Sequence, residues 1–518
     1  MIRSFLTVST GTLASRLLGF ARDSMVAALL GAGPVADAFL VAFQLTNVAR
    51  RLLTEGALNN SLVPAWLKVR ETKGPAAAAA FAGRVLGTVS VLVIAIAATA
   101  GLLMPLIMTA LAPGFSGEET LHLAVNDARL MLPYIAFAGP ATVSMALLNA
   151  HGRFALTAFA PLLFNIALLV VMTVLILMPP DAARAALAIA ATVGLAGLLQ
   201  LSILIPRGSR FASPLRVAFD SEMREFFAKA IPGMVSGAGP QILLVAGSIV
   251  ASASPSAVSW LYFANRLIEL PLGIVGVTVG AVLIGELTRA VRADDGAAVA
   301  YAQSRSLELA MALALPAMIG LIVLSEPLVQ LLFEHGAFGA SDTNGTAHAL
   351  RWLALGLPAQ MLIKALSPAF FARSDTTTPL WAMLKGFAVT IALAFVLGWL
   401  FGVEGIAASV ALGAWSSALT LIRHGVTTFG FAIDAGARRR LPRIVAATAA
   451  MGALLWLLAP LLPSASEAPH GLAHAVLVIT LIIAGIALYG LFLVLLGVIG
   501  WGAAVNAFRE TGRPRLRD

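Results

Sequence analysis

The residues that could do chemistry are charged and polar side chains inside long apolar stretches of the chain. They fall in three stretches: Ser15, Arg16, Arg22 and Asp23; Asp37, Arg50, Arg51 and Glu55; and Ser259, Asn265, Arg266 and Glu269. A charge at the centre of a bilayer costs about 2.5–3.5 kcal/mol on insertion scales, so such groups must face protein or water. Arginines outnumber carboxylates in this set, and a guanidinium makes bidentate contacts with phosphate. The pattern predicts a water-filled, cationic cavity for a phosphorylated ligand.

A second interpretation is that these charges only neutralise one another. Arg22 adjoins Asp23, and Arg51 and Glu55 are four residues apart, a spacing at which helical side chains meet. Both interpretations stay open at the level of sequence. The choice between Arg50 and Arg51 as the arginine that faces the cavity also stays open.

The composition requires lipid as the solvent. The 518-residue chain is 59% hydrophobic and 11% charged, whereas soluble domains carry about 25% charged residues. Its 34 Lys and Arg exceed its 25 Asp and Glu, but the cations lie in short loops, where they signal topology rather than nucleic-acid binding. The sequence contains no Cys and no P-loop motif. We therefore expect no metal site, no cofactor, no catalytic residue and no nucleic-acid partner.

Fourteen apolar stretches, each about 20 residues or more and so able to cross a bilayer, are predicted as transmembrane helices. They run over 4–31, 36–66, 81–111, 122–149, 155–178, 184–206, 226–252, 257–286, 304–333, 347–371, 379–401, 405–427, 443–462 and 471–502. The loops between them are alternately rich and poor in Lys and Arg. By the positive-inside rule, both termini are predicted to be cytoplasmic. The fold class is an all-α polytopic membrane protein.

An internal repeat divides the predicted helices into two halves. Pro105–Phe115 ends the third stretch and the similar Pro327–Phe338 ends the ninth, with the two prolines 222 residues apart. Because six helices separate the copies, they share one orientation and are related by a pseudo-twofold axis along the membrane normal. This predicts an N-terminal lobe over 1–215, a C-terminal lobe over 216–435, and two further helices with a tail over 436–518. A 6+6+2 arrangement is typical of the MOP exporter superfamily.

Six motifs resemble the MurJ/MviN family along nearly the whole chain. They are Ser15–Asp23, Ala36–Phe43, Asn47–Ala57, Ser259–Arg266, Leu332–Phe338 and Phe371–Pro379. The resemblance implies a flippase of the bacterial inner membrane that moves lipid II, an undecaprenyl-diphosphate-linked peptidoglycan precursor, from the cytoplasmic to the periplasmic leaflet. It also implies membrane lipids and cell-wall synthesis proteins as partners.

The resemblance further implies roles for the charged residues. Arg16, Arg22, Arg50 or Arg51, and Arg266, with Ser259, would bind the diphosphate and headgroup. The remaining polar residues would orient these arginines or gate the lobes: Ser15, Asp23, Asp37, Glu55, Asn265 and Glu269. Some relatives have a sodium site with carboxylates in the seventh and eleventh helices. This chain has none in either stretch and carries Lys385 in the eleventh, so sodium coupling is not expected.

The sequence leaves three other functions to consider. A cation-coupled drug exporter of the MOP type would need a carboxylate-centred cavity with few arginines, and an exporter of another polyprenyl-diphosphate-linked glycan would share the cationic cavity. An intramembrane enzyme acting on polyprenyl phosphates would need an acidic pair or metal cluster at a membrane face. The sequence lacks such a cluster, and we therefore expect a transporter rather than an enzyme.

Overall fold

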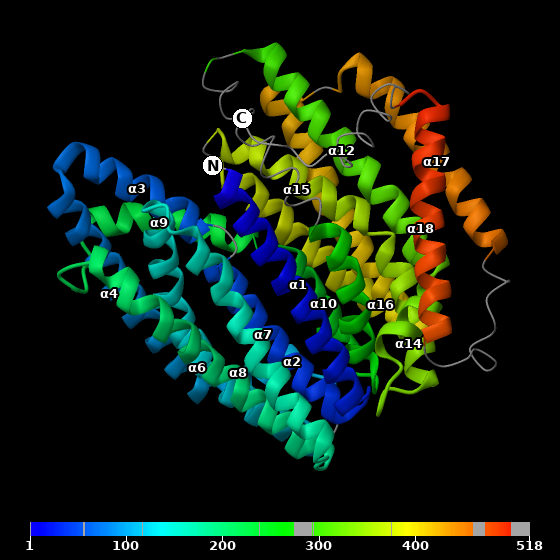
Figure 1. Ribbon diagram of the computed structural model, residues 1–518, viewed down its shortest axis with the longest axis horizontal. Helices are drawn as coiled ribbons and strands as arrows, with labels where there is room; N and C mark the ends of the chain where they lie inside the picture. The colour runs from blue at the N-terminus through cyan, green and yellow to red at the C-terminus, as the bar shows by residue number, and fades with distance from the viewer. Residues whose placement is uncertain are drawn as a thin grey trace. The chain divides into compact units, whose positions relative to one another are not determined.

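The structure is a computed structural model, and it describes residues 2–498 except 55–56, 116–117, 238, 274–292, 294, 374, 432 and 459–471. The described residues form helices and no strands (Figure 1). The helices up to residue 251 are α1 (Ile2–Leu30), α2 (Pro34–Thr54), α3 (Ala57–Lys73), α4 (Pro75–Leu102), α5 (Met104–Leu111), α6 (Glu118–Ala150), α7 (Phe154–Leu177), α8 (Ala182–Gly208), η1 (Ser209–Phe211), α9 (Ser221–Gly237) and α10 (Gly239–Ala251).

A further helix runs over residues 257–273. The later elements are α12 (Gly296–Val323), α13 (Ser325–Phe333), α14 (Ala340–Ala354), α15 (Leu357–Phe371), α16 (Thr377–Phe429), α17 (Ala435–Leu458) and α18 (Leu472–Leu495). The chain divides into two compact units. The first comprises Met1–Phe263, Leu332–Thr346 and Pro379–Val410, and the second comprises Ala264–Leu331, Ala347–Thr378 and Ala411–Asp518.

In the first unit, small residues allow α8 to lie directly against α6. A Cβ at Gly194 would lie 2.3 Å from the carbonyl oxygen of Leu130, and one at Gly197 would lie 2.9 Å from the Cα of Tyr134. Such close approach places the two backbones in contact, and α6 and α8 lie side by side (Figure 1). On other sides α6 packs against α2 and α4, and α1 packs against α7.

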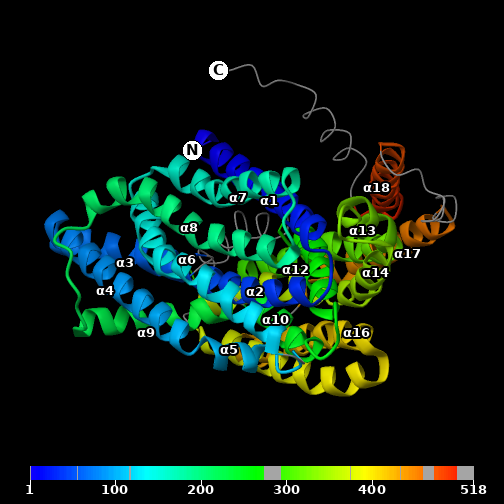
Figure 2. The same ribbon diagram turned by 90° about the horizontal axis from the view of Figure 1, so that it is seen from below.

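At one end of the first unit, α3 lies beside α4 and α9 (Figure 2). The extended segment before α9 runs along α4, where Cβ atoms at Gly83 and Gly87 would meet the carbonyl oxygens of Pro214 and Arg216 at 2.2 and 2.6 Å. Arg84 then binds Asp220 and Glu222, with 2.6 Å between the charged atoms of each pair. This ion-pair cluster ties the segment between α8 and α9 to α4.

In the second unit, α12 packs against α15 and α17, and α17 packs against α18. A Cβ at Gly452 would lie 2.5 Å from the Ile319 side chain, so α17 and α12 meet closely. The Tyr489 hydroxyl donates to the Ala312 carbonyl at 2.7 Å, which satisfies a polar group between α18 and α12. Arg440 and Arg305 both bind Glu308, at 3.1 and 3.2 Å.

The all-helical class is confirmed, but several predicted stretches are broken in the structure. The predicted 81–111 covers most of α4 and all of α5, which meet at Leu103, and 304–333 covers most of α12 and all of α13, which meet at Leu324. Eight helices in the described part of the chain are long and apolar enough to cross a membrane, and the bent pair α14 and α15 would make nine. The chain is thus a polytopic membrane protein, while the count of fourteen stays a prediction.

Proline lies just after two of these breaks, and glycine interrupts a third helix. Pro105 is the second residue of α5 and Pro327 the third of α13, positions where a missing N–H costs no helical hydrogen bond. The two landmarks of the predicted repeat therefore share one local structure, a long helix followed by a short helix that begins around proline. Within α16, Gly402 has φ 59° and ψ −137°, which interrupts the helix where the sequence predicts a loop.

Candidate functional site

Arg22 and Asp23 form a buried pair at the centre of the first unit. Arg22 is 6% exposed and Asp23 is 1% exposed. The Arg22 guanidinium donates twice to Asp23 Oδ1, at 2.7 and 2.9 Å, and once to Asn165 Oδ1 of α7 at 3.1 Å. The Asn165 amide in turn donates to the Ser15 carbonyl, and the Tyr262 hydroxyl donates to Asp23. This network joins α1, α7 and the helix over residues 257–273.

Aromatic rings complete the surroundings of Arg22. Its guanidinium carbon lies 5.0 Å from the ring centre of Phe43 and 5.7 Å from that of Phe164, distances at which a cation is attracted to the ring. In the structure, Arg22 and Asp23 form an ion pair with each other, as the second interpretation of the sequence describes. Binding of substrate by Arg22 stays a prediction.

Arg16 differs from Arg22, although both lie on α1. Its side chain is exposed, and Ser15 beside it is half-buried. Arg16 lies six positions before Arg22, so their Cα atoms are about 9 Å apart along the helix axis. The Arg16 side chain is thus exposed, whereas Arg22 is enclosed by its neighbours.

Asp37 closes the start of the helix over residues 257–273. The Asp37 side chain is 2% exposed. One carboxylate oxygen accepts from the Ser256 N–H at 2.8 Å, and the other accepts from the N–H and hydroxyl of Ser259 at 2.9 and 2.5 Å. The first N–H groups of a helix have no partner within the helix and attract negative charge. Asp37 of α2 thus acts as an N-cap supplied by a distant part of the sequence.

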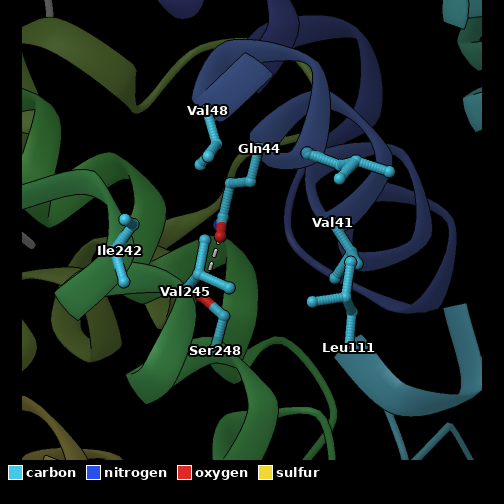
Figure 3. A pocket seen from close by; sticks show the side chains of 8 residues that line it. Val41, Gln44, Val48, Leu111, Ile242, Val245 and Ser248 are labelled. Atoms are coloured by element: carbon cyan, nitrogen blue, oxygen red, sulfur yellow. Dashed lines mark hydrogen bonds between the residues drawn. The ribbon is translucent and has the colours of Figure 1, made fainter. Parts of the chain in front are cut away.

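A second polar contact joins α2 to α10 in the same unit. The Ser248 hydroxyl donates to Gln44 Oε1 at 3.0 Å, and both side chains are buried. They border a cavity of about 120 Å³ whose other lining residues are apolar (Figure 3). The cavity is lined by Val41, Gln44, Leu45, Val48, Leu111, Ile242, Val245 and Ser248.

The remaining predicted residues of α2 lie near its end. Arg50 and Arg51 are half-buried, and Arg50 lies 3.5 Å from the Asn47 amide oxygen. Glu55, predicted to pair with Arg51, lies outside the described residues. The structure therefore places two cations within the last turns of α2 and leaves their assignment to a ligand a prediction.

In the second unit, Arg266 and Glu269 form an ion pair on one face of the helix. Arg266 Nη1 lies 2.5 Å from Glu269 Oε2, and their side chains are 21% and 16% exposed. Asn265 beside them is buried. In this ion pair, one of the five N–H donors of the Arg266 guanidinium binds the Glu269 carboxylate. Part of the Arg266 side chain remains accessible.

The predicted motif Leu332–Phe338 packs against the end of α1. Ser24 donates to the Leu332 carbonyl at 2.6 Å, and the Ala337 N–H donates to the Ala28 carbonyl at 2.8 Å. Gly336 has φ 59°, and a Cβ there would lie 2.4 Å from the Ala28 carbonyl oxygen. The motif therefore requires glycine for close backbone contact, which gives it a packing role.

Comparisons with known proteins agree with the motifs. The sequence model described as "Lipid II flippase MurJ" matches residues 26–466. The chain belongs to the lipid II flippase MurJ family. It is 36% identical over 520 residues to "Probable lipid II flippase MurJ" of Rhizobium meliloti (strain 1021), covering 99% of this chain and 96% of that protein. It is 31% identical over 431 residues to "Lipid II flippase MurJ" of Burkholderia cenocepacia, covering 81% and 83%.

Solved structures show the same fold. A MurJ structure titled "Lipid II flippase MurJ, inward closed conformation" matches with a TM-score of 0.77 at 22% identity, covering 95% of this chain and 98% of that one. An inward-facing MATE multidrug transporter of the MOP superfamily matches with a TM-score of 0.65 at 14% identity, covering 85% and 98%. The chain therefore shares its fold with MOP transporters, while the 6+6+2 division stays a prediction.

Several residues of this MurJ site were not predicted from the sequence. Asn165 and Tyr262 form hydrogen bonds with the predicted Arg22 and Asp23, and Gln44 and Ser248 form one with each other. Asn165 and Tyr262 lie 143 and 239 residues from the partners they bind. A polar residue within an apolar stretch is a usable signal, because it needs a partner in the membrane, but the signal does not identify that partner.

Proposed function

We propose that this chain flips lipid II from the cytoplasmic to the periplasmic leaflet of the bacterial inner membrane. The observation that carries the proposal is membership of the MurJ family over residues 26–466, with relatives named lipid II flippases along nearly the whole chain. A drug exporter of the MATE type has less support, because likeness at 14% identity concerns the fold alone. The activity is transport, and lipid II leaves chemically unchanged.

The substrate is an anionic diphosphate headgroup on an apolar polyprenyl tail. We assign the diphosphate to the accessible arginines, Arg16 and Arg266, with Arg50 or Arg51 as a third contact. A guanidinium keeps its charge at all physiological pH values and binds phosphate with two parallel hydrogen bonds. The headgroup would cross in a water-filled cavity while the tail stays in lipid, so neither part enters an unfavourable solvent.

Arg22 has a different role in this proposal. Its guanidinium is enclosed by Asp23, Asn165 and two aromatic rings. We assign it to the framework that holds α1 against α7, which fixes the direction in which Arg16 projects. Asp23 and Ser15 belong to the same framework, the first as counter-charge and the second through its carbonyl.

The contacts of α2 would form one gate of the transport cycle. Asp37 binds Ser256 and Ser259, and Gln44 binds Ser248. In the proposed division into lobes over 1–215 and 216–435, each of these bonds joins one lobe to the other. Alternating access requires such bonds to break when the cavity opens on their side. Asn265, Glu269 and Glu55 would orient the arginines, and both termini would lie in the cytoplasm. Cell-wall synthesis proteins are the proposed protein partners.

The test is lipid II flipping by the purified protein in vesicles. We expect wild type to move lipid II between leaflets, Arg266→Ala to lose this activity, and Arg266→Lys to recover only part of it, since lysine keeps the charge without the two-point contact. Each variant is checked for thermal stability first. Full activity of a stable Arg266→Ala variant would overturn the cationic site, and absence of lipid II flipping by wild type would overturn the function.

A further inference from the structure

A carboxyl group in α6 has no role in the network described above. Asp127 is 0% exposed, and neither of its carboxylate oxygens has a hydrogen-bond partner within the described part of the chain. It lies nine residues after Glu118, the first residue of α6, which is about 14 Å along the helix axis. The helix over Glu119–Ala150 is one of the candidate membrane spans, so the carboxyl group belongs to a segment long and apolar enough to cross a bilayer.

The residues described next to Asp127 on α6 and α8 are small or apolar. On α6 itself, its neighbours one turn away are Ala124 and Met131, both fully buried. On α8, Gly194 lies against Leu130, which places the buried Ala190 about one turn earlier, level with Asp127. Thr46 of α2 directs its hydroxyl to the Ala42 carbonyl and the Met131 sulfur. None of these groups stabilises a negative charge.

The charged groups of the helices packed against α6 are engaged elsewhere. On α2, Asp37 binds Ser256 and Ser259, and Arg50 lies against Asn47. On α4, Arg84 binds Asp220 and Glu222. The sequences of α5 and α7 contain no titratable residue. The other charged or titratable side chains on these elements are Glu118, Glu119, His122, Arg129 and Tyr134 of α6, Arg51 of α2, Lys68, Arg70, Glu71 and Lys73 of α3, and Arg184 and Arg207 of α8.

Arg129, Arg184 and His122 are the charged or titratable groups nearest to Asp127 along α6 or at a similar height on α8. None of them forms a described contact with it. Arg129 is two residues away, on the opposite side of the helix, and its guanidinium donates to the Gly101 carbonyl at 3.1 Å. Arg184 pairs with Asp181 at 3.2 Å, and both side chains are exposed. His122 is five residues before Asp127 and half a turn out of phase with it. The carboxyl group has no counter-charge among the described ion pairs.

An ionised carboxylate without a partner is very costly in such a place, so the group is neutral while it is buried. A metal cation in its place would need several oxygen ligands, and the described residues contain no cluster of three or more metal-ligating side chains. The ligand that suits a single carboxyl group in an apolar pocket is a proton.

We propose that Asp127 is a proton-binding site of the transport cycle, protonated while buried and releasing its proton when the packing around α6 opens to water. In release, the bond between Oδ and hydrogen breaks, the proton passes to water and the electron pair remains on the carboxylate; uptake is the reverse. Since charged Asp127 cannot return to its apolar pocket, release favours the open arrangement and uptake favours the closed one. This inference rests on the proposed function for its place in a cycle, while proton binding itself does not.

The first test is infrared spectroscopy of the purified full-length protein labelled with isotopically substituted aspartate. We expect a protonated-carboxyl band in wild type that is lost in Asp127→Asn and retained in Asp220→Asn, the control at an exposed carboxylate. Asparagine has the shape of the neutral acid, so the variant should fold, and thermal unfolding verifies this. Identical spectra for wild type and Asp127→Asn at neutral pH would show an ionised group and overturn the inference.

The second test is the pH dependence of lipid II flipping in vesicles. A step limited by loss of one proton changes about tenfold in rate per pH unit, so the wild-type rate should rise with pH, and Asp127→Asn should lose this slope. An unchanged slope in the variant would overturn the role in the cycle. Absence of flipping in wild type would instead reject the proposed function, and proton binding would then be decided by the infrared result alone.

Discussion

The carboxylate of Asp37 accepts both the N–H and the hydroxyl of Ser259, at 2.9 and 2.5 Å, across 222 residues of sequence. The Ser256 N–H adds a third bond at 2.8 Å. An α2 side chain therefore completes the start of a helix in the other predicted lobe. Three hydrogen bonds to one charged group hold this contact together, and each is of the stronger, charge-assisted kind.

Asp37→Asn should weaken this contact by about 1.5–3 kcal/mol, because the amide keeps one acceptor oxygen and turns an N–H₂ group toward backbone N–H groups. Ser259→Ala removes only the hydroxyl bond and should cost less. The free energy of unfolding measures both effects, and a flipping assay measures whether the gate still closes. Equal stability of Asp37→Asn and wild type would contradict the capping role.

Arg22 and Arg16 should respond differently to the same substitution. Arg22→Ala leaves Asp23 buried without its counter-charge, which typically costs about 3–5 kcal/mol. Arg16→Ala removes an exposed side chain and should change stability by about 0.5 kcal/mol or less, yet it should reduce lipid II flipping if Arg16 binds the diphosphate. Thermal unfolding and transport are measured on both variants. A stable but inactive Arg22→Ala protein would contradict the framework role and indicate that Arg22 binds the substrate.

The ion pair of Arg266 and Glu269 allows a charge exchange. The double variant Arg266→Glu with Glu269→Arg retains an i,i+3 pair on the same face but moves the cation by one helical turn. If the pair only stabilises the helix, the double variant should regain the activity lost in Arg266→Ala. We expect restored stability and no restored flipping, because a diphosphate contact depends on where the guanidinium lies.

The helical class and most helix positions could be predicted from the sequence, and the breaks could not. The stretches 155–178 and 184–206 correspond closely to α7 and α8, since each is a long apolar run with clear polar boundaries. The stretch 347–371 also reads as one apolar run, although α14 ends at Ala354 and α15 begins at Leu357. Proline and glycine mark where a helix can break, but they do not decide that it does, because Pro133 and Pro140 both lie inside the continuous α6.

The candidate site was predicted as a set of residue types rather than as an arrangement. The sequence indicates that Arg16 and Arg22 are unusual in an apolar helix, but it does not distinguish the exposed one from the enclosed one. The difference comes from Asn165, which binds Arg22 from α7. Asp127 could have been found by one signal, a carboxylate in an apolar stretch with no Lys or Arg three or four residues away.

Acid should weaken the ion-pair cluster between α4 and the start of α9. The Met223 N–H, donated at 2.9 Å, and the Arg84 guanidinium lower the pKa of Asp220 below its ordinary value of 3.8. A group with a lowered pKa in the folded state stabilises the protein above the ordinary pKa and loses this contribution as the pH falls through the folded value. Thermal stability should therefore decrease below about pH 4, and Asp220→Asn should remove part of that decrease. If Asp220→Asn loses as much stability in acid as wild type does, other carboxylates cause the decrease.

Gly336 and Gly339 provide a matched pair for testing the role of the Leu332–Phe338 motif. Gly336 has φ 59°, and a Cβ there would lie 2.4 Å from the Ala28 carbonyl oxygen, whereas a Cβ at Gly339 would meet nothing within 4 Å. Gly336→Ala should cost at least about 1–2 kcal/mol from backbone conformation alone, with more from the forced separation of the motif from α1. Gly339→Ala should be close to neutral. Unfolding of the two purified variants measures the difference, and equal stability would show that this motif does not depend on close contact with the end of α1.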